Sequence, residues 1–145
     1  MNYKAWKGSL VELKVITEFV KRGYQVYSPF IQNGPVDCII ETIEGFKKIQ
    51  IKTADKRNRS QTYYASVRSK RSRKNYALYD IDFIICEADD RYFILSKSDF
   101  IRSDNWWISI NQYEGLWSKI SQPKDSDECK QVKKEETQLN LTLIN

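Results

Sequence analysis

Apolar residues recur at helical spacing between positions 10 and 22, and this pattern predicts the first helix of the chain. Four of them lie three, four, seven and eight positions after Glu12 and form one stripe: Val15, Ile16, Phe19 and Val20. Gly23 then ends the segment, as glycine commonly does after the last helical turn. Because an amphipathic helix turns its apolar stripe to the core, Glu12 is expected to face inward. Lys14 and the other charged residues of the helix are expected in solvent.

Two short runs rich in β-branched residues flank residues 44–45 and predict a β-hairpin over residues 35–52. A two-residue turn at 44–45 would place Asp37 opposite Lys52. Side chains alternate between the two faces of a strand, so Asp37, Gln50 and Lys52 are expected to share one face of the sheet. Their apolar neighbours then point to the opposite face.

Four further runs have the composition of strands, and they cover residues 24–30, 61–67, 81–87 and 92–95. The last two form a second hairpin, and the first half of the 81–87 run is apolar on both faces, which is typical of a central strand. Residues 69–79 are expected to form a loop that leads into a short helix. Beyond residue 98 the pattern weakens, and it indicates a strand at 106–110 and a short helix at 112–120.

This order of elements predicts an α/β fold. Residues 1–120 are expected to form one domain, since 145 residues with 41% hydrophobic content can bury a single modest core. Residues 121–145 are polar and predict a mobile C-terminal tail, in which 139–144 can dock as a strand. We see no apolar run of membrane-spanning length, no signal peptide and no disulfide or zinc spacing among the three cysteines, which favours a cytoplasmic protein.

Positive charge is concentrated in one part of the chain. Lysine and arginine number 24 against 19 acids, and the segment 52–74 holds nine basic residues and one acid. Such a segment suits a polyanionic partner and can contact phosphates, and its arginines can also read guanine edges. The alternative is an ordinary solvated loop and strand face. The candidate DNA-binding residues are Lys56, Arg57, Arg59, Arg68, Lys70, Arg71, Arg73 and Lys74.

The chain contains no histidine. This excludes Ser-His-Asp and Cys-His catalysis, imidazole zinc sites and nucleases that use a histidine base. Chemistry based on acids, amides, lysines and a metal ion remains.

A carboxylate, an amide and an ammonium on one face of a hairpin form the outline of a metal-dependent phosphodiester-cleaving site. Asp37, the side-chain oxygen of Gln50 and the Ile51 carbonyl are candidate ligands of Mg²⁺, with Mn²⁺ as a substitute. Lys52 would orient a water molecule or stabilise developing charge. Glu12 would help to hold a second metal or a metal-bound water, because an inward carboxylate is costly unless it is paired or ligates a metal. The alternative is that Glu12 caps a helical turn or pairs with a lysine at the rim.

Glu12, Pro35-x-Asp37 and Gln50-x-Lys52 resemble the motif of PD-(D/E)XK nucleases, and the resemblance spans residues 6–98. Gly8-x-x-x-Glu12 and the later pattern from Asp80 to Ile94 are similar to PD-(D/E)XK homing endonucleases encoded in group I introns, and less closely to archaeal Holliday junction resolvases. The resemblance implies a restriction-endonuclease-like mixed sheet flanked by helices, Mg²⁺ dependence and duplex DNA as substrate. This chain departs from the general motif at Gln50, where an acid is usual, so the expected metal site loses one negative charge.

The residues and the resemblance together predict a site-specific endonuclease that cleaves both strands of duplex DNA. Cutting two strands needs two sites, which favours a homo-oligomer, a dimer or a tetramer. Two alternatives remain: a junction resolvase, and a non-catalytic DNA-binding module with a decayed site. The nuclease prediction depends on Glu12 reaching the polar residues of the hairpin.

Overall fold

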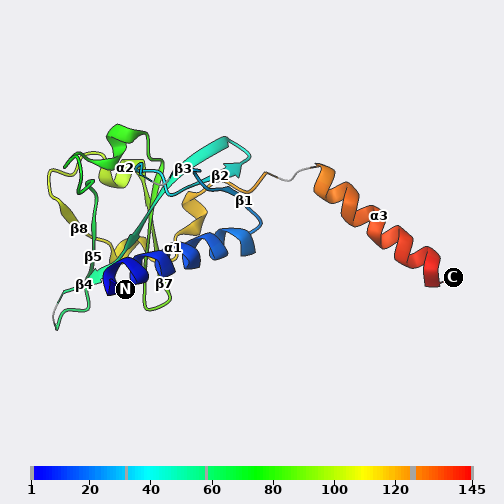
Figure 1. The fold of residues 1–145 in the computed structure, drawn as a ribbon, viewed down its shortest axis with the longest axis horizontal. Coiled ribbons are helices and arrows are strands. Elements are labelled where there is room, and N and C mark those ends of the chain that lie inside the picture. Colours follow the sequence, from blue (N-terminus) through cyan, green and yellow to red (C-terminus); the bar gives the residue numbers. More distant parts are fainter. Residues whose placement is uncertain (1, 32, 58, 125–126, 145) are drawn as a thin grey trace.

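The computed structural model describes residues 2–31, 33–57, 59–124 and 127–144, with side chains from residue 135 onward in the last helix. Its main feature is a five-stranded sheet in the order β1-β2-β3-β6-β7 (Figure 1). The strands are β1 (Gln25–Tyr27), β2 (Cys38–Thr42), β3 (Gly45–Thr53), β6 (Phe83–Ala88) and β7 (Arg91–Ser96). β3 and β6 run parallel, and the other neighbouring pairs are antiparallel. The predicted mixed sheet is confirmed, although β1 is shorter than the predicted strand at 24–30.

A second, antiparallel sheet has the order β4-β5-β8. Its strands are β4 (Asp55–Lys56), β5 (Tyr63–Ser66) and β8 (Trp107–Ser109). Tyr63 and Ala65 point inward and pack with Ile84 and Cys86 of the main sheet in one apolar cluster. The predicted strands at 61–67 and 106–110 therefore belong to a sheet that covers one face of the main sheet.

Helix α1 (Tyr3–Lys21) lies against the opposite face of the main sheet (Figure 1). Val11, Val15 and Phe19 pack there with the isoleucines of β2, β3 and β6. Shorter helical turns complete the body: η1 (Tyr76–Tyr79), α2 (Lys97–Phe100), η2 (Asn111–Tyr113) and η3 (Trp117–Lys119). η1 confirms the short helix expected near residue 79, while the helix predicted at 112–120 is replaced by η2 and η3.

The buried side of α1 differs from the predicted stripe. The helix begins at Tyr3 rather than at residue 10, and its buried line runs along Val11, Val15 and Phe19. This line turns Val20 outward, where 59% of the residue is exposed, so the prediction that Val20 faces the core is wrong. The solvated position expected for Lys14 is also wrong: its Nζ lies 3.0 Å from Glu87 Oε1 and 2.8 Å from Asp90 Oδ1. Lys14 is drawn inward because Glu87 is buried and needs a cation.

The first hairpin is confirmed, but its turn lies one residue earlier than predicted. The turn residues are 43–44, so that Cys38 pairs with Ile49. Thr42 stabilises this turn, because its hydroxyl donates to the Gly45 carbonyl (2.9 Å) and accepts from the Glu44 N–H (3.1 Å). The resulting register differs from the predicted one by a full side-chain period, so every residue keeps its predicted face.

Residues 121–124 pack against the body, and a helix follows. The Tyr24 hydroxyl donates to the Ser121 carbonyl at 2.7 Å, and the Ile43 N–H donates to the Gln122 carbonyl at 2.9 Å. Helix α3 (Asp127–Ile144) then lies apart from the two sheets (Figure 1). The prediction of a strand at 139–144 is wrong, because this glycine- and proline-free segment continues a run of good helix formers. None of the helices in the described residues has the length and apolar character to cross a membrane.

Candidate active site

Asp37 ends the pairing between β2 and β3 with its side chain. Its backbone N–H donates to the Ile49 carbonyl at 2.9 Å, while the Ile51 N–H donates to Asp37 Oδ2 at 2.8 Å. The Ile51 N–H would bond to a backbone carbonyl of the neighbouring strand if the pairing continued. It donates instead to a carboxylate oxygen of Asp37. β3 continues to Thr53 beyond its last pair with β2. The sheet is therefore open at this end of β3, next to Asp37.

Glu12 and Lys52 approach this opening from different sides. Ile51 belongs to the core beneath α1, so its neighbours Gln50 and Lys52 point to the other face of the sheet. Glu12 lies on α1, yet it lines the same cavity of about 240 Å³ as Ile51 and Lys52. The two side chains come from opposite faces of the sheet and share one cavity lining, and the Glu12 carboxylate also acts on the charge of Asp37. That Glu12 comes close enough to the hairpin residues to share a cation with them stays a prediction.

Burial and charge act together on Asp37. Burial raises the pKa of Asp37 to about 6, with a further increase from the Glu12 carboxylate; the Ile51 N–H and the Lys52 ammonium oppose the shift. Two carboxylates therefore share a region in which Lys52 compensates only part of their negative charge. A bound cation would relieve this imbalance.

Lys52 is held in a partly desolvated position. Burial lowers the pKa of Lys52, Asp37 opposes this shift, and Lys70 adds to it. Its Nζ lies 5.0 Å from the centroid of the Tyr76 ring. The ring therefore supports the ammonium from one side, while the cavity remains open on the other.

Gln50 is oriented by its own neighbour. Its Nε2 donates to the Ile51 carbonyl at 3.1 Å, which turns Oε1 away from that carbonyl. Gln50 is 7% exposed and lines a second cavity of about 380 Å³ together with Lys52 and Tyr76. The Ile51 carbonyl, which was expected as a third ligand, already accepts this bond with one lone pair.

The available oxygen donors fit a cation that keeps most of its water. Asp37 offers its second carboxylate oxygen and Gln50 offers Oε1, both suited to a hard ion. Within the described residues, no group of three or more Asp, Glu, Cys and His side chains is arranged to hold a metal. Mg²⁺ commonly binds through one or two carboxylates plus water and substrate phosphate oxygens, and the donors here agree with that mode.

The predicted DNA-binding residues divide into two kinds. Arg68 is half-buried, and its Nη1 and Nη2 donate to the carbonyls of Arg73 and Asp104 at 3.4 and 2.9 Å. These bonds hold the loop after β5, which is a structural contribution. The other seven residues are exposed: Lys56, Arg57, Arg59, Lys70, Arg71, Arg73 and Lys74. Lys70 lines both cavities beside Lys52.

Several residues of the site carried no functional signal in the sequence. Trp107, Ser66 and Asp55 come from the second sheet and line the cavity that contains Glu12. Trp107 was recognised as part of a strand, but its distance in sequence from the hairpin concealed this position. Tyr76 lies in the segment 69–79 that was expected to form a loop and a short helix, and its contact with Lys52 depends on the fold.

Comparisons with known proteins identify a family and a shared fold. A profile of the PD-(D/E)XK endonuclease family matches residues 1–105. Among solved structures, the chain is similar to a bacterial homing endonuclease, I-Ssp6803I, with a TM-score of 0.68 and 19% sequence identity over 81% of this chain and 91% of that chain. At this identity the likeness shows a shared fold. A search of curated proteins gives no significant match.

Proposed function

The chain belongs to the PD-(D/E)XK endonuclease family, and we propose that it is a site-specific, Mg²⁺-dependent endonuclease that cleaves both strands of duplex DNA. The observation that carries the proposal is the cavity lined by Glu12 of α1 and by Ile51 and Lys52 of β3, where the Ile51 N–H is bonded to the Asp37 carboxylate. The fold shared with a bacterial homing endonuclease supports an enzyme of that kind. Encoding in an intron is proposed from the sequence resemblance alone.

Each residue of the site has a role that follows from its chemistry. Asp37 and Gln50 would hold the cation through oxygen atoms, and bound Mg²⁺ would supply charge neutralisation and a more acidic water. Lys52 places an ammonium where the phosphate acquires negative charge, and the Tyr76 ring limits its movement. Glu12 lines the same cavity, where its carboxylate would accept a hydrogen bond from the attacking water or from a metal-bound water. Exposed Lys70 at the rim attracts the DNA backbone.

A library of duplex DNA tests the activity directly. Incubation with the protein and Mg²⁺, followed by sequencing of the cut ends, should recover one recurring site with both strands cut. Asp37→Asn serves as the inactive control, because it keeps the shape of the side chain and removes its charge. Absence of cut ends with either Mg²⁺ or Mn²⁺ would contradict the proposal. Preferential cutting of a four-way junction over linear duplex would assign the protein to the resolvases instead.

We propose that two copies act together, since each chain carries one such site and both strands are cut. Helix α1 offers a surface for this contact, because exposed apolar residues recur on its outer side with coiled-coil spacing. They are Tyr3, Trp6, Leu10, Leu13 and Val20. A second copy covering this stripe would remove it from water.

Light scattering tests this contact. Leu13→Glu should shift the protein to monomers, while Ile43→Glu at the exposed hairpin turn should leave its mass unchanged. The two positions are matched, with 63% and 65% exposure. A wild-type monomer on DNA would refute the oligomer.

Gln50 favours one second candidate, a DNA-binding module without catalysis. Its amide gives the site a ligand of lower charge than the acid usual in the motif. Titration with Mn²⁺ distinguishes the two functions, since a decayed site should bind no Mn²⁺ at Asp37 in the presence of DNA.

We also propose that the nuclease domain extends from residue 1 to residue 124 and that α3 is a separate appendage. Residues 121–124 contribute hydrogen bonds and the Lys124–Glu41 ion pair, at 3.3 Å, to the body. A chain ending at residue 124 should fold with unchanged stability.

A further inference from the structure

Two consecutive tyrosines of β5 each carry a stacked arginine on opposite faces of the second sheet. Tyr63 points into the core, and the Arg91 guanidinium carbon lies 4.8 Å from its ring centroid. Tyr64 points outward, and the Arg57 guanidinium carbon lies 4.6 Å from its ring centroid. The two pairs have the same stacking chemistry in different surroundings.

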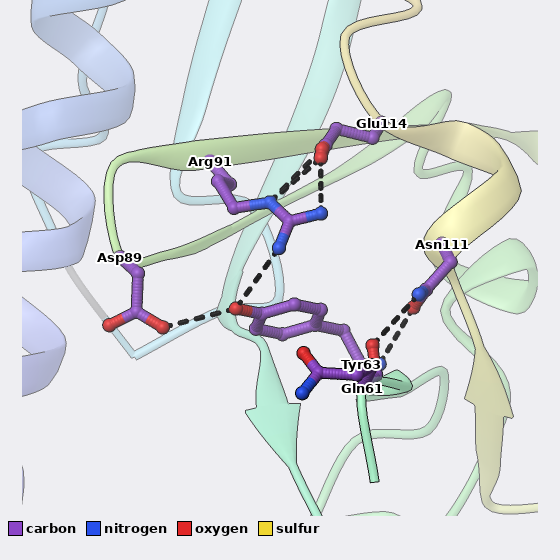
Figure 2. Close-up of polar contacts among 6 residues, drawn as sticks. All are labelled: Gln61, Tyr63, Asp89, Arg91, Asn111 and Glu114. Carbon is purple, nitrogen blue, oxygen red and sulfur yellow. Dashed lines mark hydrogen bonds and ion pairs between the residues drawn. The ribbon is translucent and has the colours of Figure 1, made fainter.

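Arg91 is occupied by partners within the protein (Figure 2). Its Nε donates to both Glu114 carboxylate oxygens, at 2.7 and 3.0 Å, and its Nη1 donates to the Tyr63 hydroxyl at 3.4 Å. The Tyr63 hydroxyl in turn donates to Asp89 at 3.1 Å. This network joins β5, β7 and the segment before η3. The Arg91 side chain therefore stabilises the fold, because its donors are bonded to groups within the protein.

Arg57 has the opposite character. A second ring, that of Trp107, has its centroid 5.7 Å from the same guanidinium carbon. Within the described residues, no carboxylate forms an ion pair with Arg57, and its side chain is exposed. The guanidinium lies over the Tyr64 ring and near the Trp107 ring, and in the part of the chain that the structure describes no hydrogen bond or ion pair takes up its N–H donors. A fixed fork of free donors is suited to planar acceptor pairs.

The position of Arg57 connects this fork to the active site. Trp107 lines the cavity that contains Glu12 and Lys52, so Arg57 is one aromatic ring away from the proposed site of cleavage. Arg57 directly follows β4, and the β4–β5 hairpin lies at the end of the body away from β1 and β2 (Figure 1). β4 is the edge strand of the β4-β5-β8 sheet, so Arg57 lies at an edge that DNA can approach, and the major groove is wide enough to admit such an element.

We propose that the β4–β5 hairpin enters the major groove and that Arg57 reads one guanine close to the cut phosphate, through bonds to O6 and N7. This inference rests on the proposed function and adds a specificity-determining residue to it. The Tyr64 and Trp107 rings hold the guanidinium in a fixed orientation before DNA binds, which lowers the entropy lost on recognition. Arg57 is a better candidate for reading a base than the other exposed basic residues. A phosphate contact needs only a positive charge, whereas reading a base needs a guanidinium plane held in a fixed orientation.

The test compares sequence profiles of variants on a library in which every base pair of the recovered site is randomised. Arg57→Ala should lose the preference for guanine at one position by about ten- to a hundredfold and keep the other positions unchanged. Arg57→Lys should lose the same preference while retaining the salt dependence of binding, because lysine keeps the charge and lacks the fork. Arg102→Ala, at an exposed arginine outside the basic segment, is the matched control and should leave the profile unchanged.

Two results would overturn the inference. One is an Arg57→Ala profile identical to that of the wild type. The other is an equal loss for all sequences with a salt slope shallower by about one, which would assign Arg57 to a phosphate. If the wild type binds DNA without cleaving it, the proposed function fails. The same sequence profiles are then measured on DNA selected for binding, and they still decide whether Arg57 reads a guanine. A wild type that binds no duplex DNA refutes both.

Discussion

The two faces of strand β3 differ in chemistry, although their residues alternate along one short stretch. Ile49 and Ile51 are buried against α1 in an apolar core. Gln50 and Lys52 point to the other face, where burial lowers the pKa of Lys52 and two cavities open. Apolar burial stabilises a fold, whereas burial of an amide or an ammonium costs free energy unless it is compensated. The comparison separates residues that hold the fold from residues retained for chemistry.

The largest expected effect comes from the polar face. Lys52→Met should reduce cleavage by about a hundred- to a thousandfold, since it removes an ammonium aimed at the transition-state charge. The protein should stay folded with little change in Tm, because the substitution removes a partly desolvated charge. Single-turnover cleavage and thermal unfolding measure the two quantities. Lys48→Met, at an exposed position of the same strand, is the control, and an equal loss in both variants would remove the special role of Lys52.

The apolar face should respond in stability. Ile49→Ala should lower the free energy of unfolding by about 2–5 kcal/mol, because it leaves a cavity beneath α1. The folded fraction should still cleave DNA at low temperature. Urea denaturation gives the stability, and Ile43→Ala at the exposed turn should change it by less than about 0.5 kcal/mol. A stable Ile49→Ala variant that had lost its activity would invert the comparison.

Lower pH should weaken cation binding at the polar face. The pKa of Asp37 is raised to about 6 by burial, so protons compete with the cation below that pH. The apparent affinity for Mn²⁺ should fall by about tenfold per pH unit below pH 6. Calorimetric titration at several pH values measures this slope. An affinity that does not change between pH 5 and pH 7 would place the cation elsewhere.

The same titration should appear in stability when EDTA removes cations. The folded state binds the Asp37 proton more tightly than the unfolded chain does, since its pKa is raised from 3.8 to about 6. The free energy of unfolding therefore falls as the pH rises from about 3.8 to about 6. Above pH 6 the destabilisation by the buried, charged Asp37 is fully present. Asp37→Asn should remove this part of the pH dependence in urea denaturation. An Asn variant that retains the wild-type slope would show that other groups cause it.

The smallest effect is expected from restoring the acid at the divergent position of the motif. Gln50→Glu should tighten Mn²⁺ binding by about three- to tenfold, because it adds a negative charge to the ligand set. The added carboxylate should also raise the pKa of Asp37 further and move the loss of binding to higher pH. Gln50→Met, which removes the ligand oxygen, should weaken binding. Equal Mn²⁺ affinity in all three proteins would exclude residue 50 from the cation site.

Local pattern was sufficient for much of the fold and for the faces of β3. The helix before Gly23, both hairpins and the alternation of Gln50 and Lys52 with buried isoleucines follow from short-range periodicity. The predicted register of the first hairpin was wrong because it was based on the dipeptide at 44–45 alone. The hydrogen bonds of the Thr42 hydroxyl to Gly45 and Glu44 stabilise a turn one residue earlier. Val20 was misplaced because α1 has a second apolar stripe on its outer side, and periodicity alone does not say which stripe is buried.

The sequence by itself determined the chemical types available here: acids, an amide and lysines without histidine, next to a basic segment. Only the tertiary structure decided that Glu12 and Lys52 line one cavity, that Arg68 holds a loop, and that Trp107 both lines this cavity and lies near Arg57. The physical reason is that alternation and helical period act between near neighbours. Contacts between β3, β5 and β8 depend instead on how whole elements bury their apolar faces together.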